Sequence, residues 1–145
     1  MAITSAICSS FKQELLQGKH SFESSGGHTF KIALYDSDAT LGASTTAFST
    51  SEEITNTSGT AYTSGGASLT SVTPVASSTT AICDFSDVSY SSASFTANGA
   101  LIYNSSASNV AVCAIAFGSD KTATNGTFTI QFPTADATNA IIRLA

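Results

Sequence analysis

Short strand-like segments separated by turn residues recur through the second half of this chain, at intervals of about ten residues. They begin with "SLTSVTPV" at Ser68 and continue to "AIIRLA" at Ala140. Such spacing is typical of antiparallel sandwiches and barrels, because each strand turns back beside its predecessor. We therefore predict a mainly β protein, an antiparallel β-sandwich or jelly-roll-like barrel with one short N-terminal α-helix.

The end of the chain carries the clearest strand patterns. The segment "NVAVCAIAFGS" is almost wholly apolar, which predicts a strand covered on both faces. In "NGTFTIQF", Phe128, Ile130 and Phe132 alternate with polar residues and should share the inward face. The final "AIIRLA" predicts a closing strand. It either completes the chain's own sheet or lies against a neighbouring subunit, since an exposed apolar edge invites aggregation.

Turn and edge signals separate these strands. Asn125-Gly126 predicts a turn, and Asn98-Gly99 predicts a turn or a bulge. Pro74 indicates an edge strand or a break, because proline cannot donate to a strand ladder. The length of 145 residues suits a single domain, 1–145, with the β-sandwich over 28–145.

A long polar stretch follows the first predicted strand, "TFKIALY", whose residues Phe30, Ile32 and Leu34 share one face. From residue 36 to residue 66 the sequence is mostly Ser, Thr, Gly, Ala and acidic residues. Long loops of this kind are usually functional or mobile, so we expect partner contacts here. The candidate contact residues in this loop are Glu52, Glu53 and Tyr62.

The first 19 residues differ from the rest. Apolar residues recur there at every fourth position, which places them on one face of a helix. Thr4 or Ser5 is a suitable N-cap, and Gly18 is a suitable stop. The amphipathic helix over 1–19 either covers the end of the β-core or serves as a docking arm. In the second case its contact residues are Ile3, Ile7, Phe11 and Leu15.

Charge is scarce, and this restricts the classes of partner. Charged residues make up 10% of the chain, whereas Ser and Thr supply 46 of its 145 residues. The net charge is −5 and the five basic residues are scattered, so we expect no nucleic-acid partner. Apolar runs are far shorter than the roughly 20 residues that span a bilayer, and no secretory signal is visible. We expect no membrane contact, and folding in a cytoplasm.

The residue types that carry catalysis do not form a recognised pattern. No G-x-S-x-G segment occurs. The acid pairs Glu52-Glu53 and Asp84/Asp87 could serve glycosidic hydrolysis, but sugar clefts are normally lined with aromatic residues and the chain contains no Trp. We therefore predict that the protein is not an enzyme and uses no cofactor.

Metal ligands are also poorly matched. His20 and His28, with Glu23 between them, fit no recognised metal-site spacing and predict a surface turn. Asp36 and Asp38 resemble the start of a calcium loop but lack the further acids and the terminal Glu that such a loop requires. A hydrogen-bonded turn is the better prediction for them, and we assign no metal site.

The three cysteines, Cys8, Cys83 and Cys113, are widely spaced and include no C-x-x-C pair. Cys83 and Cys113 fall in strand-like segments, where buried free thiols act as small hydrophobic groups. A Cys83–Cys113 disulfide remains the alternative if their strands face each other.

The order of segments resembles a known class of protein. An amphipathic start, "MAITSAICSSFKQELLQGKHSF", leads into "TFKIALYDSDATLGASTTAFSTSEEI", and the chain ends in "GALIYNSSASNVAVCAIAFGSDKTATNGTFTIQFPTADATNAIIRLA". This arrangement resembles small virion structural proteins of tailed bacteriophages, particularly capsid decoration (cement) proteins. The resemblance extends over nearly the whole chain and implies a β-sandwich or jelly-roll homotrimer seated on the major capsid protein.

Two functions follow as expectations. The first is a decoration protein that stabilises the head by binding the major capsid protein or another virion protein. It would lie on the capsid surface after assembly in the host cytoplasm, where many weak contacts add up through avidity. The alternative is a tail, neck or fibre component with a receptor- or glycan-binding role. Such modules generally expose aromatic residues on loops, and Tyr62, Tyr90 and Tyr103 are the tyrosines available beside Tyr35.

Overall fold

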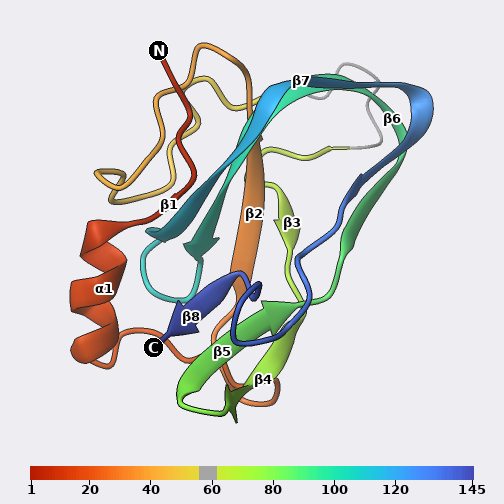
Figure 1. Ribbon diagram of the computed structural model, residues 1–145. Coiled ribbons are helices and arrows are strands. Elements are labelled where there is room, and N and C mark those ends of the chain that lie inside the picture. Colours follow the sequence, from red (N-terminus) through yellow and green to blue (C-terminus); the bar gives the residue numbers. More distant parts are fainter. Residues whose placement is uncertain (56–61) are drawn as a thin grey trace.

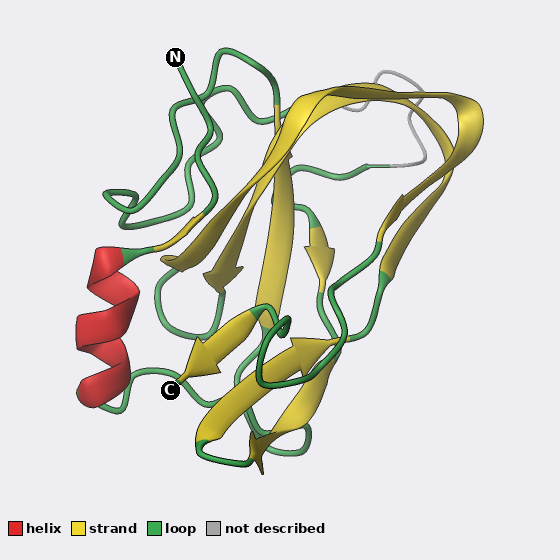
Figure 2. Cartoon of the chain, in the orientation of Figure 1, coloured by secondary structure: helices red, strands yellow, loops and turns green. Residues whose placement is uncertain are grey.

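The computed structural model describes residues 1–55 and 62–145, which form two antiparallel sheets and one short helix (Figures 1 and 2). The five-stranded sheet has the order β1-β7-β6-β2-β3, and the three-stranded sheet has the order β4-β5-β8. The prediction of a mainly β, sandwich-like fold with one short helix is confirmed. The elements are β1 (Ala6–Ile7), α1 (Ser9–Leu16), β2 (Phe30–Tyr35), β3 (Ala67–Ser68), β4 (Ser71–Ser77), β5 (Thr80–Phe85), β6 (Val88–Asn104), β7 (Val110–Ile130) and β8 (Ile142–Leu144).

Strand β2 lies in the interior of the five-stranded sheet. It pairs with β6 from Phe30 opposite Asn104 to Tyr35 opposite Gly99. The alternation of Phe30, Ile32 and Leu34 is present as predicted, but Ala33 and Tyr35 on the other face are buried too. The loop after β2 covers that second face: the Tyr35 hydroxyl donates to the carbonyl of Ser49 at 2.6 Å.

Strands β6 and β7 form a two-stranded ribbon of 17 and 21 residues. Residues 99–104 and 110–116 belong to the five-stranded sheet, whereas residues 88–97 and 121–130, here called the distal arm, leave it and bend over (Figure 1). The bend coincides with a register shift at which Asn98 alone lies opposite residues 117–120. Extra residues on one strand of a pair bend the ribbon locally.

The two Asn-Gly dipeptides both lie inside this ribbon. Asn98-Gly99 lies at a bulge, one of the two features predicted for it, but the extra residues are 117–120 of the partner strand β7. The turn predicted at Asn125-Gly126 is wrong, because β7 continues through it to Ile130. Asn125 instead has a φ of 48° at a second register shift. The left-handed conformation of Asn125 suits a bulge as well as a tight turn, so the dipeptide alone does not distinguish them.

The three-stranded sheet contains the closing strand. β8 pairs with β5 through Ile142 opposite Cys83, so the final apolar segment completes the chain's own sheet. β4 is the opposite edge of this sheet. Its register shifts between Val72 and Val75, around Pro74, and this confirms the edge position predicted for that proline.

Helix α1 is shorter than predicted and begins later. Ile3 and Ile7 are not helical: Ile7 belongs to β1, which pairs with β7, and Ile3 forms a bridge with Leu41. The backbone groups of residues 6–8 are therefore satisfied by a strand partner, and the helix begins only after Cys8, which has extended backbone angles. Phe11 is buried and Leu15 is half-buried against the core.

The end of α1 is as predicted. Gly18 has a φ of 72°, and its N–H donates to the carbonyl of Leu15 at 3.2 Å. The N–H of Lys19 donates to the carbonyl of Glu14 at 3.0 Å. These two bonds form the Schellman motif, in which glycine accepts the left-handed conformation at low cost.

Aromatic rings connect the helix with both sheets. Phe22 stacks on Phe30 of β2 with ring centroids 4.3 Å apart, and Phe85 of β5 lies 5.8 Å from both Phe30 and Phe132. Phe11 of α1 makes an edge contact with Phe22 at 5.9 Å. The aromatic pairs add to the apolar area that the two sheets bury between them.

The cysteines are free. Cys83 lies in β5 of the three-stranded sheet and Cys113 in β7 of the five-stranded sheet, so their strands are not neighbours. The alternative of a Cys83–Cys113 disulfide is therefore wrong for this structure, and the interpretation as buried or half-buried thiols holds.

Candidate functional site

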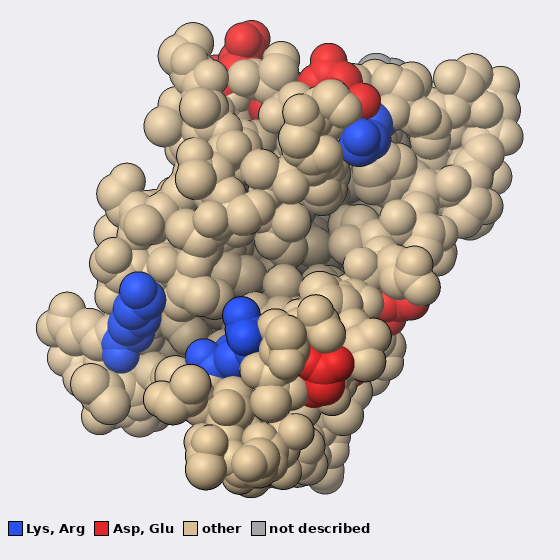
Figure 3. Space-filling view, viewed as in Figure 1, with Lys and Arg blue, Asp and Glu red and all other residues tan. Residues whose placement is uncertain are grey.

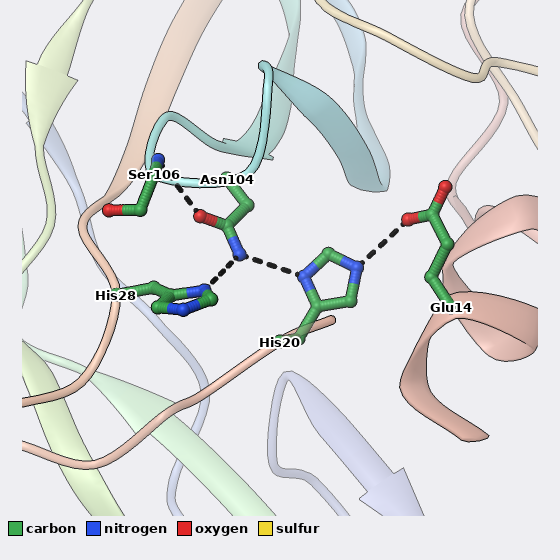
Figure 4. Close-up of polar contacts among 5 residues, drawn as sticks. All are labelled: Glu14, His20, His28, Asn104 and Ser106. Atoms are coloured by element: carbon green, nitrogen blue, oxygen red, sulfur yellow. Dashed lines mark hydrogen bonds and ion pairs between the residues drawn. The ribbon is translucent and has the colours of Figure 1, made fainter. Parts of the chain in front are cut away.

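A chain of buried polar side chains connects α1 with the end of β6 (Figure 4). Asn104 Nδ2 lies 3.0 Å from His20 Nδ1 and 2.9 Å from His28 Nδ1. The Asn104 Oδ1 atom accepts the backbone N–H of Ser106 at 3.1 Å. His20 Nε2 lies 2.9 Å from Glu14 Oε2.

The backbone N–H of Ser106 fixes the protonation pattern of this chain. A backbone N–H can only donate, so the amide oxygen of Asn104 faces Ser106 and its NH₂ group donates to both imidazole rings. Both Nδ1 atoms are therefore acceptors. His20 then carries its proton on Nε2 and donates it to the Glu14 carboxylate.

This chain of polar side chains links helix α1 and the segment after it to the end of β6. Asn104 is fully buried, and Glu14 and His20 are 9% exposed. The aromatic rings of Phe11 and Phe30 flank His20 at 4.8 Å and 6.2 Å. The predicted surface turn at the histidines is wrong for His20, and its partner is Glu14 rather than Glu23.

None of the three cysteine thiols is an activated nucleophile. Burial and then the nearby Glu14 carboxylate raise the pKa of Cys8 to about 11. Burial raises the pKa of Cys83 to about 11, and burial followed by the influence of Cys8 raises the pKa of Cys113 to about 12. Thiols with raised pKa values stay protonated at neutral pH and react slowly.

A second buried network closes the long polar loop. From the described residues the Glu53 carboxylate accepts three hydrogen bonds: from the Tyr62 hydroxyl at 2.7 Å, the Ser64 hydroxyl at 2.8 Å and the Gly65 N–H at 2.6 Å. The Tyr62 hydroxyl also accepts the N–H of Leu34 in β2 at 2.9 Å. Burial, and then the bond to Glu53, raises the pKa of Tyr62 above its ordinary value.

The remaining acids of the loop lie on its surface. The N–H of Asp38 donates to Asp36 Oδ1 at 2.9 Å, which confirms the hydrogen-bonded turn predicted for these residues. Carboxylate oxygens of Asp36, Asp38 and Glu52 lie within 4.8 Å of one another. The proximity of Glu52 to the two aspartates was not predicted, because residues 39–51 separate them in the sequence.

The predicted contact residues fall into two groups. Phe11, Glu53 and Tyr62 are buried inside the chain, so their side chains present no surface to a partner in this conformation. Ile3, Ile7 and Leu15 are half-buried against the core, and Glu52 is exposed. Part of the loop predicted over 36–66, namely 56–61, lies outside the described residues.

The surface feature that sequence reasoning missed is the distal arm. Its outer face carries cross-strand pairs of uncharged groups: Ser89 and Thr129 hydroxyls lie 3.0 Å apart, and Thr96 and Thr122 hydroxyls lie 2.8 Å apart. Beside the bend, Asn98 Nδ2 donates to Asp120 at 2.8 Å. A chain with 46 Ser and Thr residues is expected to have many surface hydroxyls, but their pairing depends on register shifts that composition does not specify.

A hollow lies beside β7 of the same ribbon. A cavity of about 500 Å³, here called the β7 hollow, lies between Ile115 and Phe117 before the bend and residues 128–133 after it. Figure 3 shows this face of the molecule sunken near its centre, with few charged side chains around it. Most of its wall is apolar, and Lys121 contributes the cation.

Comparisons with known proteins identify no relative: no protein-family model, curated protein or solved structure matches this chain. Within residues 1–55 and 62–145, none of the helical structure has the length and apolar character needed to cross a membrane.

Proposed function

We propose that this protein is a non-enzymatic virion structural protein, most specifically a capsid decoration protein that binds the major capsid protein. The observation that carries the proposal is the distal arm: a hydrogen-bonded ribbon that bends over from the sheet, with an outer face of uncharged hydroxyl pairs. A surface ordered in this way loses little side-chain freedom on binding, and many copies add their modest contacts by avidity.

The burial of the four tyrosines favours a role in assembly over glycan binding. Tyr35, Tyr62, Tyr90 and Tyr103 are all buried, with exposures of 1%, 1%, 6% and 2%. Phe48 is stacked on Tyr103 with ring centroids 4.6 Å apart. Glycan sites usually need an aromatic face open to solvent, which none of these four tyrosines provides. A tail, neck or fibre location remains the second candidate because the same arm could join other virion proteins.

The proposal is tested on particles. Antibodies raised against the purified chain are used to probe virions banded by buoyant density from the host culture that produces it. Co-banding with DNA-filled particles, with gold label distributed over the head, is the expected result. Label confined to the tail would establish the second candidate, and recovery only in the soluble fraction would refute a virion role.

The oligomeric state is measured separately by light scattering on a size-exclusion column. A decoration protein at three-fold positions is expected to form a homotrimer, with a mass three times the 14.7 kDa of the chain. A monomer at every concentration, in the presence and absence of shells, would contradict the trimeric form of the proposal.

A further inference from the structure

The β7 hollow borders the edge of a strand rather than one of its faces. Six consecutive residues, 128–133, line it. Only residues 128–130 belong to β7, and residues 131–133 continue the chain beyond the strand. Successive side chains of a strand point to opposite faces, so a cavity bordered by three consecutive strand residues runs along the edge of that strand. Burial agrees with this alternation, because Ile130 and Phe132 are buried while Thr129 and Gln131 are exposed.

That edge of β7 has no neighbouring strand beyond its first residues. On the side away from β6, β1 pairs with β7 only at Cys113 and Ala114, and the Ser5 hydroxyl accepts the N–H of Ala116. For residues 117–130, the described part of the chain supplies no further strand on that side. An edge strand with accessible N–H and C=O groups is a template for pairing with another chain.

The chemistry of the hollow restricts what can pair there. Phe117 and Phe128 contact each other in its wall with ring centroids 6.2 Å apart, and Ile115 adds to the apolar lining. Lys121 is exposed, and its Nζ donates to the Ser119 hydroxyl at 3.0 Å. No carboxylate of the described residues forms an ion pair with Lys121. The site therefore suits an apolar group beside a negative charge.

We propose that the β7 hollow binds an extended peptide segment of a partner protein, which adds a strand to the free edge of β7. One apolar side chain of the segment enters the hollow, and a neighbouring carboxylate pairs with Lys121. Strand addition supplies affinity through the main chain and specificity through pockets for alternate side chains. The edge of β7 continues from residue 121 to residue 130, so a segment of about six residues fits along part of it. This inference rests on the proposed function, since it specifies how an assembly protein recognises its partner.

The experiment uses the purified full chain, labelled with ¹⁵N, and blocked synthetic hexapeptides. The reference peptide alternates valine with threonine and carries one central aspartate. A second peptide has lysine in place of the aspartate, a third is N-methylated on alternate amides, and octanoate serves as a small apolar carboxylate. The protein variants are Lys121→Glu and, as a matched control on the exposed surface of α1, Lys12→Glu.

We expect the reference peptide to shift amide resonances of residues 115–133 and to bind at least tenfold more tightly than the N-methylated and lysine peptides. Lys121→Glu should reverse the preference between the aspartate and lysine peptides, whereas Lys12→Glu should leave it unchanged. Equal binding of the N-methylated peptide, or tighter binding of octanoate, would overturn strand addition in favour of a small-molecule pocket.

Two further outcomes would also overturn the inference. The first is the absence of any resonance shift with the peptides. The second is a concentration-dependent shift of the same resonances without peptide, which would assign the edge to a second copy of this chain. Because these measurements use the isolated protein, their failure is distinguishable from failure of the virion proposal, which the particle experiment decides.

Discussion

The hydroxyl of Tyr62 donates to the carboxylate of Glu53 across 2.7 Å, in the interior of the protein. The same hydroxyl accepts the N–H of Leu34, so one phenol oxygen connects the long loop to the central sheet. The position of both residues in a long polar loop predicted that they would lie on a partner surface. Their burial shows that polar residues in a polar loop can form the internal anchor of that loop.

Replacing this phenol tests the anchor. Tyr62→Phe removes a hydrogen bond to a buried carboxylate and leaves the N–H of Leu34 without its partner. We expect the free energy of unfolding to fall by about 3 kcal/mol, because unsatisfied buried groups are costly. Urea denaturation measures the change. The control is Ser89→Ala in the exposed Ser89–Thr129 pair, which should change stability by no more than about 0.5 kcal/mol. Similar effects of the two variants would contradict the anchor.

The Asn104 side chain provides the second prediction. Asn104→Ala removes the donor to both histidines and leaves the N–H of Ser106 unsatisfied, with His20 still buried. A loss of about 3 kcal/mol is expected on the same grounds. His28→Ala removes only one of these bonds at a half-buried ring and should cost about 1 kcal/mol. A larger cost for His28→Ala than for Asn104→Ala would show that Asn104 is not the centre of the polar chain.

Two glycines give a matched pair of substitutions. Both have positive φ, 72° at Gly18 and 76° at Gly66, so alanine is strained at each. A Cβ at Gly18 meets nothing within 4 Å, whereas a Cβ at Gly66 would lie 1.8 Å from the carbonyl oxygen of Ile32. Gly18→Ala should cost about 1 kcal/mol, from the backbone conformation alone. Gly66→Ala should cost more than about 3 kcal/mol, because β2 must also move. Equal melting temperatures for the two variants would refute this difference.

Alkaline pH should unfold the protein cooperatively. Burial raises the pKa of Tyr35 to about 12 and that of Tyr90 to about 12, and it also raises the pKa values of Tyr62 and Tyr103. A folded-state pKa above the unfolded value makes the stability contribution complete below the unfolded pKa of about 10 and progressively smaller above it. Phenolate absorbance at 295 nm should therefore appear together with loss of the far-ultraviolet circular dichroism. Phenolate formation near pH 10 with an unchanged dichroism spectrum would contradict the prediction.

The role of α1 can be tested without removing its core residues. Leu16 is 92% exposed, while Phe11 and Glu14 on the same helix are buried. Leu16→Glu should therefore change stability by no more than about 0.5 kcal/mol. It should also leave the mass measured by light scattering unchanged, because the helix covers the β-core. A change in oligomeric mass with unaltered stability would restore α1 as the docking arm.

Local patterns predicted the parts of this fold that depend on neighbouring residues. The alternation in β2, the glycine stop of α1, the edge position of Pro74 and the Asp36 turn all follow from short-range chemistry. Ile3 and Ile7 have helical spacing, yet their backbone pairs with segments distant in the sequence. A four-residue spacing of apolar side chains does not show whether the backbone forms a helix or pairs with a distant strand.

The candidate sites were less predictable for the same reason. The polar chain joins Glu14 to Asn104, and the β7 hollow exists because Asn98 lies opposite residues 117–120. Both depend on register between segments far apart in the sequence. Lys121 was noted only as one scattered basic residue, and its position at an apolar hollow emerges from the bend of the ribbon.

The paired hydroxyls of the distal arm are insensitive to the ionic medium, unlike the exposed Lys121 of the same arm. Coulombic contacts between exposed charges weaken as dissolved salt shortens the screening length, which is about 30 Å at 0.01 M and about 8 Å at 0.15 M. Pairs such as Thr96 and Thr122 carry no net charge, so a change in salt concentration leaves the hydrogen bond between them almost unaltered. We therefore expect a contact made through the hydroxyl pairs to keep its strength as the salt concentration rises, and a contact made through Lys121 to weaken.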